Sequence, residues 1–350
     1  MSAGIFLLAA AVLFTVLIVL GWRHLPGEQY QMLATVPVAR VDATHWQGIN
    51  FTWYGALIAT SVTIAILFVL IISGSAGIAL GPVLALLMLI VGLGVPAARV
   101  VARLVERKQH TFTIGGAFFV GLAALPLLIL LVNGGCLLLH ARPLDMQVML
   151  AALAIGYILG EGLGRMACVS FGCCYGTPLD QCGPIALRLF NRLAFVFTGA
   201  TKKAVYEGNL AGVKLVPIQG LTCALYTATA LIACAFFLQG HYRSAFLLSL
   251  VVSQVWRVLS EMLRADFRGF TAISAYQKMS LAAIVYGCGL SLLVPSPLVP
   301  LPEITRGLAV LCNPLLILGL QLLWVTLFFI FGRSMVTSAS LSFAVRHDRI

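Results

Sequence analysis

Charged residues are scarce in this 350-residue chain: Asp, Glu, Lys and Arg together make up 9% of it, whereas hydrophobic residues make up 61%. A soluble domain carries about 25% charged residues, so the composition excludes a soluble globular fold and predicts an integral membrane protein. A basic tail or arm is also absent. The formal net charge is +11, but the basic residues lie in short loops between apolar runs, which argues against nucleic acid and favours anionic lipid as the partner.

Apolar runs long enough to cross a bilayer fill most of the sequence. A membrane-spanning helix needs about 20 predominantly apolar residues. We therefore expect an all-α, polytopic helical bundle, a single membrane domain over residues 1–350, with polar loops at 22–51 and 164–216. The first run lacks a basic start and a small-residue cleavage site, so it is interpreted as an anchor. The nine expected spans are 3–21, 52–73, 75–95, 114–133, 146–163, 217–238, 242–261, 277–296 and 308–331.

The basic residues also bear on orientation. With the N-terminus outside, the loops on the inner side hold most of the Lys and Arg, including six in the segment 164–216. The positive-inside rule then places this long loop in the cytoplasm. Basic residues that bind lipid headgroups would not report topology, so the sidedness stays open at this point.

The chain has nine cysteines. Five lie within or beside apolar runs and are expected to pack as small apolar side chains. The other four, Cys168, Cys173, Cys174 and Cys182, cluster in the long loop. No C-x-x-C pair and no histidine accompany them, and adjacent cysteines ligate one tetrahedral metal poorly, so we expect no metal at these cysteines. A disulfide, close packing in a glycine-rich turn and a reactive thiol all remain open.

An arginine follows a glycine-rich run at the expected end of the span 146–163. The run 160–165 reads Gly-Glu-Gly-Leu-Gly-Arg, and its glycines, Gly164 among them, let a backbone pass close to a neighbour or a ligand. The guanidinium of Arg165 is always charged and can bind two phosphate oxygens at once. A snorkelling interfacial arginine is the alternative, but the glycines and Glu161 favour an anion site.

Three charged residues share one helix face at the end of the span 242–261. Arg257, Glu261 and Arg264 follow one another at spacings of four and three residues. Charge at the end of an apolar span is costly unless it is paired. Glu261 is expected to bridge the two arginines and to leave donors for an anion, so we favour a phosphate site over a purely structural ladder of ion pairs.

Four further residues are weaker candidates. Tyr54 opens the span 52–73, where an aromatic residue either anchors the interface or orients a headgroup. Gly116 either lets helices pack closely or lines a site. Gln219 either caps a helix or binds a polar ligand, and Gln277 lies three residues after Ser274 in what reads as a capping box.

Taken in order, these motifs resemble the prolipoprotein diacylglyceryl transferase family. The resemblance covers about 50–290, the transferase-like core, and leaves 1–49 and 300–350 as additional terminal spans. Its most specific elements are the Gly-Arg pair with the following GCCYG and the R-x-x-x-E-x-x-R pattern. The full order is Trp53-Tyr54-Gly55, Gly115-Gly116, Gly164-Arg165, GCCYG, Pro217-x-Gln219, Arg257 with Glu261 and Arg264, and Ser274-x-x-Gln277.

The resemblance implies a multi-pass enzyme of the bacterial inner membrane that needs no metal or cofactor. Such an enzyme moves diacylglyceryl from phosphatidylglycerol to the lipobox cysteine thiol of a prolipoprotein and releases glycerol phosphate. The implied partners are phosphatidylglycerol, prolipoprotein signal peptides and the lipid bilayer, and the long loop lies outside the cytoplasm, against the charge count. The implied catalytic residues are Arg165, Arg257 and Glu261, and the implied substrate-binding residues are Tyr54, Gly116, Gly164, Cys168, Gly176, Gln219, Arg264 and Gln277.

The chain departs from the family pattern on the side of the acceptor thiol. Val120 stands where the family commonly has a histidine, Cys168 replaces an asparagine, and the run 219–222 replaces Gln-Leu-Tyr-Glu by Gln-Gly-Leu-Thr. The half of the site that binds lipid phosphate is thus retained, and the half that activates the thiol is eroded. A transferase with another acceptor, a non-catalytic phospholipid-binding protein and a membrane thiol redox protein remain as alternatives.

Overall fold

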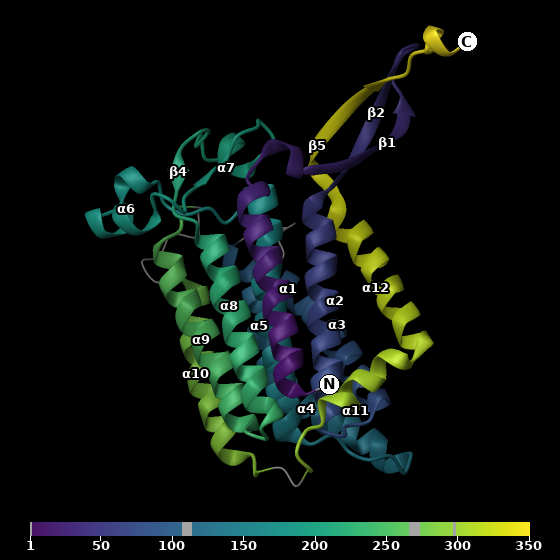
Figure 1. Ribbon diagram of the computed structural model, residues 1–350, viewed down its shortest axis with the longest axis vertical. Coiled ribbons are helices and arrows are strands. Elements are labelled where there is room, and N and C mark those ends of the chain that lie inside the picture. The colour runs from purple at the N-terminus through teal and green to yellow at the C-terminus, as the bar shows by residue number, and fades with distance from the viewer. Residues whose placement is uncertain (1, 107–113, 266–273, 297–298) are drawn as a thin grey trace.

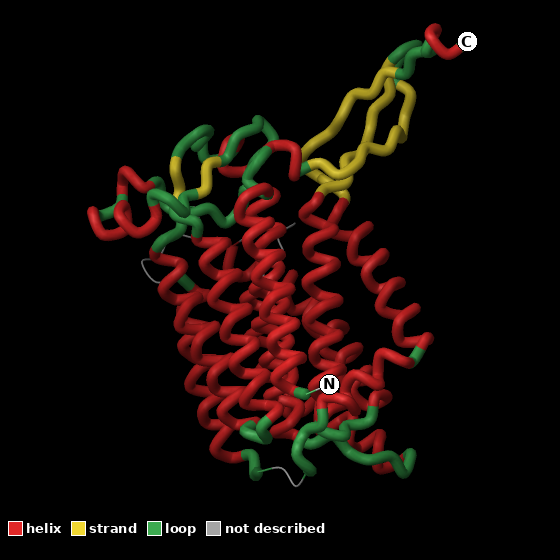
Figure 2. The backbone as a smooth tube through the Cα atoms, viewed as in Figure 1, coloured by secondary structure: helices red, strands yellow, loops and turns green. Residues whose placement is uncertain are grey.

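The structure, a computed structural model, describes residues 2–106, 114–265, 274–296 and 299–350 and shows a helical bundle with a sheet projecting from one end (Figures 1 and 2). Of the described helices, eight are long and apolar enough to cross a membrane, so the chain is a multi-pass membrane protein. These eight are α1 (Ala3–His24), α2 (Trp53–Ser75), α3 (Leu80–Glu106), α4 (Ile114–Leu138), α5 (Met146–Phe171), α8 (Ile218–Leu238), α9 (Tyr242–Met262) and α12 (Pro314–Gly332). Arg107, Lys108 and Arg268, which belong to the charge count, lie outside the described residues.

A further helix, α10 (Ala275–Leu293), corresponds to the eighth expected span, 277–296, and packs against α9 and α4. Its start follows the predicted capping box. The Ser274 hydroxyl accepts from the backbone N–H of Gln277, and the Gln277 side chain accepts from the backbone N–H of Ser274 at 2.9 Å. The capping-box prediction is confirmed.

The helix α5 forms the centre of the bundle, between α2, α8 and α9. Glycines on α5 allow α2 to approach: an added Cβ at Gly156 would lie 2.3 Å from the Val69 side chain, and one at Gly160 would lie 2.8 Å from the Ala65 Cβ. At its start, the Asp145 side chain accepts from the backbone N–H of Val148 at 2.9 Å. The rigid setting of α5 matters because this helix carries most of the site.

Several predicted helix boundaries are wrong, among them both ends of the span 75–95, where the structure has α3 from Leu80 to Glu106. The helix α5 continues to Phe171, beyond residue 163, because the left-handed residue that ends it is Gly172, with φ +72°. Arg165 and Cys168 therefore lie in the helix, and the long loop covers 172–217. The last span begins at Pro314, because the Asn313 side chain caps this helix and proline fits its first turn. Before it come α11 (Ile304–Ala309) and the 3₁₀ turn η3 (Val310–Cys312).

The all-α expectation holds for the bundle, and the extramembrane sheet was not predicted. Its strands are β1 (Met32–Arg40), β2 (His45–Thr52) and β5 (Arg333–Ser342), paired antiparallel in the order β1-β2-β5. The sheet pairs β1 and β2, from the N-terminal part of the chain, with β5, from the C-terminal part. It begins next to the close contact between α2 and α12. An added Cβ at Gly55 would lie 2.1 Å from the Cα of Gly332, which explains the glycine in the Trp-Tyr-Gly motif.

The long loop folds at the same end of the bundle as the sheet (Figure 1). It has an internal apolar centre, since Phe195 and Phe197 are buried and Phe195 lies 5.0 Å from the Trp22 ring of α1. Lys202 anchors it by donating to the carbonyls of Leu25 at 3.0 Å and Ser170 at 2.5 Å. Its elements are η2 (Leu179–Gln181), α6 (Pro184–Phe190), β3 (Phe195–Val196), α7 (Lys203–Tyr206) and β4 (Lys214–Leu215).

Candidate functional site

A buried carboxylate on α5 holds two arginines from different helices. Arg165, one turn further along α5, donates to Glu161 Oε1 at 2.6 Å, and Arg257 of α9 donates to Oε1 and Oε2 at 2.7 Å. The exposed fractions of the three side chains are 19% for Arg165, 1% for Glu161 and 9% for Arg257. Two buried cations share one anion here, so the cluster keeps a net positive charge of one.

Aromatic residues pack around the guanidinium of Arg257. It donates to the Tyr157 hydroxyl at 2.6 Å, and its Cζ lies 5.9 Å from the centre of the Phe118 ring, a cation–π contact. The Tyr157 hydroxyl itself donates to Glu161. Gly115 of α4 makes the space, because an added Cβ there would lie 3.0 Å from Arg257 Nη1. The GG motif of α4 therefore serves the charged cluster, and the predicted Gly116 is buried beside it.

A small cleft lies beside this cluster, with a cavity volume of about 10 Å³, which is room for roughly one water molecule. The Nε2 of Gln219 donates to the Cys173 carbonyl at 2.8 Å, which leaves Gln219 Oε1 buried without a hydrogen-bond partner among the described residues. Arg165 Nε is in the same situation. A polar ligand in the cleft would find one acceptor and one donor to satisfy. The lining residues are Arg165, Cys174, Ile218, Gln219, Thr222, Ser260 and Arg264.

Arg264 lines the cleft, and its backbone lies against the turn that follows α5. Gly176 and Arg264 form an isolated antiparallel bridge. An added Cβ at Gly176 would lie 2.3 Å from the carbonyl oxygen of Val216, so only glycine permits this close passage. Arg264 Nη1 lies 3.9 Å from Glu261 Oε1. Glu261 was expected to pair with both Arg257 and Arg264. In the structure it pairs with Arg264, whereas Arg257 pairs with Glu161.

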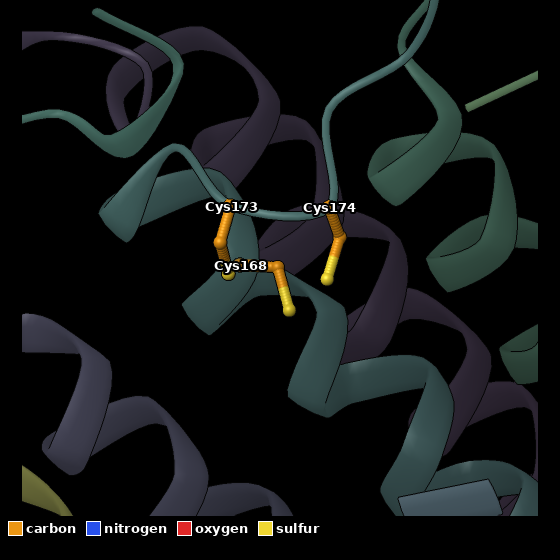
Figure 3. A group of neighbouring side chains, drawn as sticks. All are labelled: Cys168, Cys173 and Cys174. Atoms are coloured by element: carbon orange, nitrogen blue, oxygen red, sulfur yellow. The ribbon is translucent and has the colours of Figure 1, made fainter. Parts of the chain in front are cut away.

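Three thiols gather where α5 ends. The backbone N–H of Cys173 donates to the Cys168 carbonyl at 3.1 Å, and that of Gly172 donates to the Val169 carbonyl at 3.2 Å. This Schellman pattern brings the side chains of Cys168 and Cys173 together, and Cys174, with φ +57°, turns its side chain to the same place. The three Sγ atoms lie within 4.8 Å of one another (Figure 3).

All nine cysteines are thiols, and no disulfide links the long loop. Cys182 lies apart from the trio, with its Sγ donating to the Pro178 carbonyl at 3.4 Å. Hydrogen bonds that the Cys173 thiol donates to Cys168 and Cys174, together with burial, raise the pKa of Cys173 well above its ordinary value. The Cys173 thiol is therefore protonated at neutral pH.

The remaining predicted residues lie near the site or support it. Tyr54 of α2 packs against the ring of Phe171 at 5.8 Å, next to the thiols. Gly164 faces Ser61 of α2, at 3.4 Å from an added Cβ to Ser61 Oγ, and so serves helix packing. The Nε2 of Gln277 donates to the Val258 carbonyl at 3.1 Å. Together with the capping box, this contact occupies the Gln277 side chain and leaves it a structural role.

A structural reason exists for one departure from the family pattern. Gly220 receives the indole of Trp22 from α1, because an added Cβ at Gly220 would lie 2.3 Å from the Trp22 ring. Thr222, two residues on, accepts from the Trp256 indole N–H at 2.8 Å. The additional first helix thus packs directly onto the segment that has changed. Val120 lies on α4, which carries no histidine among its described residues.

Glu161 was not among the predicted site residues. In the sequence it stands out only as a neighbour of Arg165. The missing signal was the spacing of Tyr157, Glu161 and Arg165 at four-residue intervals, which places all three on one helix face. A tyrosine and two charges on the buried face of an apolar helix are rarely there without a function.

Fold and site together define a polytopic membrane protein with a cationic, polar cleft at the loop end of its bundle. The sequence model of the prolipoprotein diacylglyceryl transferase family matches residues 42–293. Because the match covers well over half of the chain, the chain belongs to this family.

A curated relative supports the assignment over a shorter stretch. The phosphatidylglycerol–prolipoprotein diacylglyceryl transferase of Clostridium tetani is 30% identical over 150 residues, which are 41% of this chain. The chain spans about half the length of that relative, 52%.

Proposed function

We propose that the chain transfers a diacylglyceryl group from phosphatidylglycerol to the cysteine thiol of a prolipoprotein signal peptide in a bacterial inner membrane. The observation that carries the proposal is the convergence of Arg165 and Arg257 on Glu161 beside a polar cleft. One carboxylate offsets one of the two buried cations, and the remaining charge favours a phosphate. The Clostridium tetani relative is named for the same reaction.

The chemistry follows from the charge distribution. The acceptor sulfur forms a bond to the glyceryl carbon, the bond from that carbon to the phosphate oxygen breaks, and glycerol phosphate leaves with the electron pair. Negative charge therefore develops on the departing phosphate. Arg165, Arg257 and Arg264 are fixed cations that stabilise such charge, and their helices hold them in place before the reaction. In this proposal, Gln219 binds a hydroxyl group of the headgroup, and the loop end of the bundle faces away from the cytoplasm.

The test is lipoprotein modification in a bacterium depleted of its own transferase. We expect expression of the chain to add the mass of one diacylglyceryl group to the acceptor cysteine of a reporter prolipoprotein. Arg165→Ala and Arg257→Ala should abolish the adduct, whereas Arg188→Ala, an exposed arginine of the same loop, should leave it unchanged. Absence of the adduct, with wild-type protein inserted in the membrane at normal level, would contradict the proposal.

A second candidate is transfer to a different acceptor with the same lipid donor. The observation that favours it is Val120, an apolar side chain where the family resemblance places a histidine. Incubating membranes with radiolabelled phosphatidylglycerol distinguishes the two candidates. Release of labelled glycerol phosphate without a lipoprotein adduct indicates the second candidate, and no release at all indicates a phospholipid-binding protein without catalysis.

A further inference from the structure

The three thiols at the end of α5 are not explained by phosphate binding. Among the His, Cys, Asp and Glu side chains that the structure describes, Cys168, Cys173 and Cys174 form the one group of three or more close enough to hold a metal ion. They come from a seven-residue stretch whose backbone is fixed by the Schellman turn and by the left-handed Cys174. A turn that aims three sulfurs at one point is arranged for more than packing.

We propose that Cys168, Cys173 and Cys174 bind a divalent zinc-class ion with one open coordination position, and that this position takes the acceptor thiol. A Zn–S bond is about 2.3 Å long, so the sulfurs of a tetrahedral site are about 3.8 Å apart. The observed thiols, all within 4.8 Å of one another, need only rotamer changes to reach this spacing. Three cysteine ligands leave a fourth position open, as in catalytic zinc sites.

The surroundings fit the charge of such a site. Three thiolates and one divalent ion carry a net charge of −1, which requires a cation nearby. Arg165 is close enough to Cys168 and Cys174 to interact with both electrostatically. Its Nε is buried without a partner among the described residues. Arg165 would thus face the thiolate complex on one side and the phosphate on the other.

The position of Cys174 connects the ion to the cleft. Cys174 belongs to the thiol cluster and also lines the cleft together with Arg165, Gln219 and Arg264. An ion held by the three sulfurs therefore borders the space that the phosphate group would occupy. An acceptor thiol bound to the ion would lie within reach of the glyceryl carbon, which an in-line displacement requires it to attack from the side opposite the departing phosphate oxygen.

The proposed ion would activate the acceptor thiol, which the apolar side chain of Val120 cannot do. A thiol that coordinates zinc loses its proton, so no histidine is needed to remove it. The acceptor R–SH binds as a thiolate, and its proton passes to water. The sulfur electron pair then forms the bond to the glyceryl carbon while the carbon–oxygen bond to phosphate breaks, and the ion stays divalent throughout. The role in transfer rests on the proposed function, whereas the metal site does not.

Metal binding is tested first, on the full-length protein purified in detergent under reducing conditions. We expect one zinc per chain by elemental analysis after gel filtration, and intense sulfur-to-cobalt charge-transfer absorption when Co²⁺ replaces it. Cys168→Ser, Cys173→Ser and Cys174→Ser should each weaken zinc binding by at least about tenfold. Cys182→Ser, in the same loop but apart from the trio, and Cys223→Ser, buried in α8, are the controls that should keep full binding.

Protection from alkylation keeps the test valid if a variant folds poorly. In the wild type, zinc should shield three thiols from a maleimide and leave Cys182 reactive. Wild-type protein with nine titratable thiols and no bound zinc would overturn the proposal. So would zinc at full stoichiometry and unchanged affinity in all three trio variants.

The open position is tested separately, with a peptide that carries the acceptor cysteine and the same peptide with serine. Only the cysteine peptide should shift the absorption of the Co²⁺-loaded protein. A shift without any diacylglyceryl adduct would support the metal site and contradict the proposed transfer. An adduct formed by metal-free protein, or an indifferent cobalt spectrum, would overturn the role of the ion and leave the transfer standing.

Discussion

Arg257 of α9 donates to both carboxylate oxygens of Glu161 on α5 at 2.7 Å, across 96 positions of sequence. The contact joins the central helix of the bundle to the helix that carries the R-x-x-x-E-x-x-R pattern. Because Arg165 shares the same carboxylate, a change at Glu161 affects both arginines at once. The carboxylate is therefore a positioning group for the cations, and it would have no direct contact with the phosphate.

Glu161→Gln should destabilise the protein and impair transfer. The neutral amide keeps the shape of the side chain but leaves two buried guanidinium groups without their anion. Removing one partner of a buried ion pair costs about 3–5 kcal/mol, so the apparent thermal midpoint in detergent should fall by several degrees. Differential scanning fluorimetry checks this. The control is Glu207→Gln, because Glu207 pairs with Lys203 at 3.1 Å on the surface, where an ion pair contributes about 1 kcal/mol at most.

Gly115→Val should reduce transfer more than it reduces stability. An added Cβ at Gly115 would lie 3.0 Å from Arg257 Nη1, so a valine displaces the guanidinium from Glu161. A displacement of about 1 Å at a catalytic group can cost about a hundredfold in rate. The matched control is Gly121→Val on the same helix, where an added Cβ meets nothing within 4 Å. Equal rates for the two variants, measured as release of glycerol phosphate, would contradict the placement of Arg257 in the site.

The helical bundle was predictable because each span is recognisable from its own stretch of sequence. A run of about 20 apolar residues has few alternatives to a membrane helix, and Ser274 with Gln277 marks a helix start by spacing alone. The boundaries of α5 were not predictable in the same way. The glycines from Gly160 to Gly164 looked like a helix end, but α5 tolerates them because α2 and α8 pack against them.

The unpredicted features depend on contacts between distant parts of the sequence. The strand β5 pairs with β2 across almost the whole chain, and no local pattern encodes such a pairing. The motif residues Arg165, Gln219 and Arg264 were recognised, but their convergence on one cleft required the fold. Likewise, no local pattern shows that the adjacent cysteines at 173 and 174 bring their sulfurs together, because this depends on the positive φ of Cys174.

Gly176→Ala should push the turn that follows α5 away from the backbone at Val216. The added Cβ would lie 2.3 Å from the Val216 carbonyl oxygen, and this neighbour is backbone, which cannot rotate away. Overpacking of this kind costs about 1–3 kcal/mol. The displaced turn also contains Cys174, so its sulfur moves relative to those of Cys168 and Cys173. We expect a lower thermal midpoint and weaker zinc binding together. Gly183→Ala, in the same loop with open space at its Cβ, should change stability by less than about 1 kcal/mol.

Lys202 should make the stability of the protein rise with pH above about 8. Burial lowers the pKa of its amine from 10.5 to about 8, while the unfolded chain keeps the higher value. Between these two values the unfolded state binds more protons than the folded state, so stability increases as the pH rises through this window. Below pH 8 the amine is charged in both states, and the full cost of burying it is present.

The measurement is the difference in apparent thermal midpoint between wild type and Lys202→Met, at pH 7 and at pH 10. Subtracting the midpoint of the variant from that of the wild type cancels the pH dependence of all other groups. The loss of the hydrogen bonds to the two carbonyls contributes equally at both pH values and cancels when the two differences are compared. Each unit of pKa depression corresponds to about 1.4 kcal/mol, so the wild type should gain several degrees on the variant between the two pH values. Lys203→Met, which removes the neighbouring surface lysine paired with Glu207, should show a flat difference. A flat difference for Lys202→Met as well would mean that its amine is hydrated and does not fasten the loop to the carbonyls of Leu25 and Ser170.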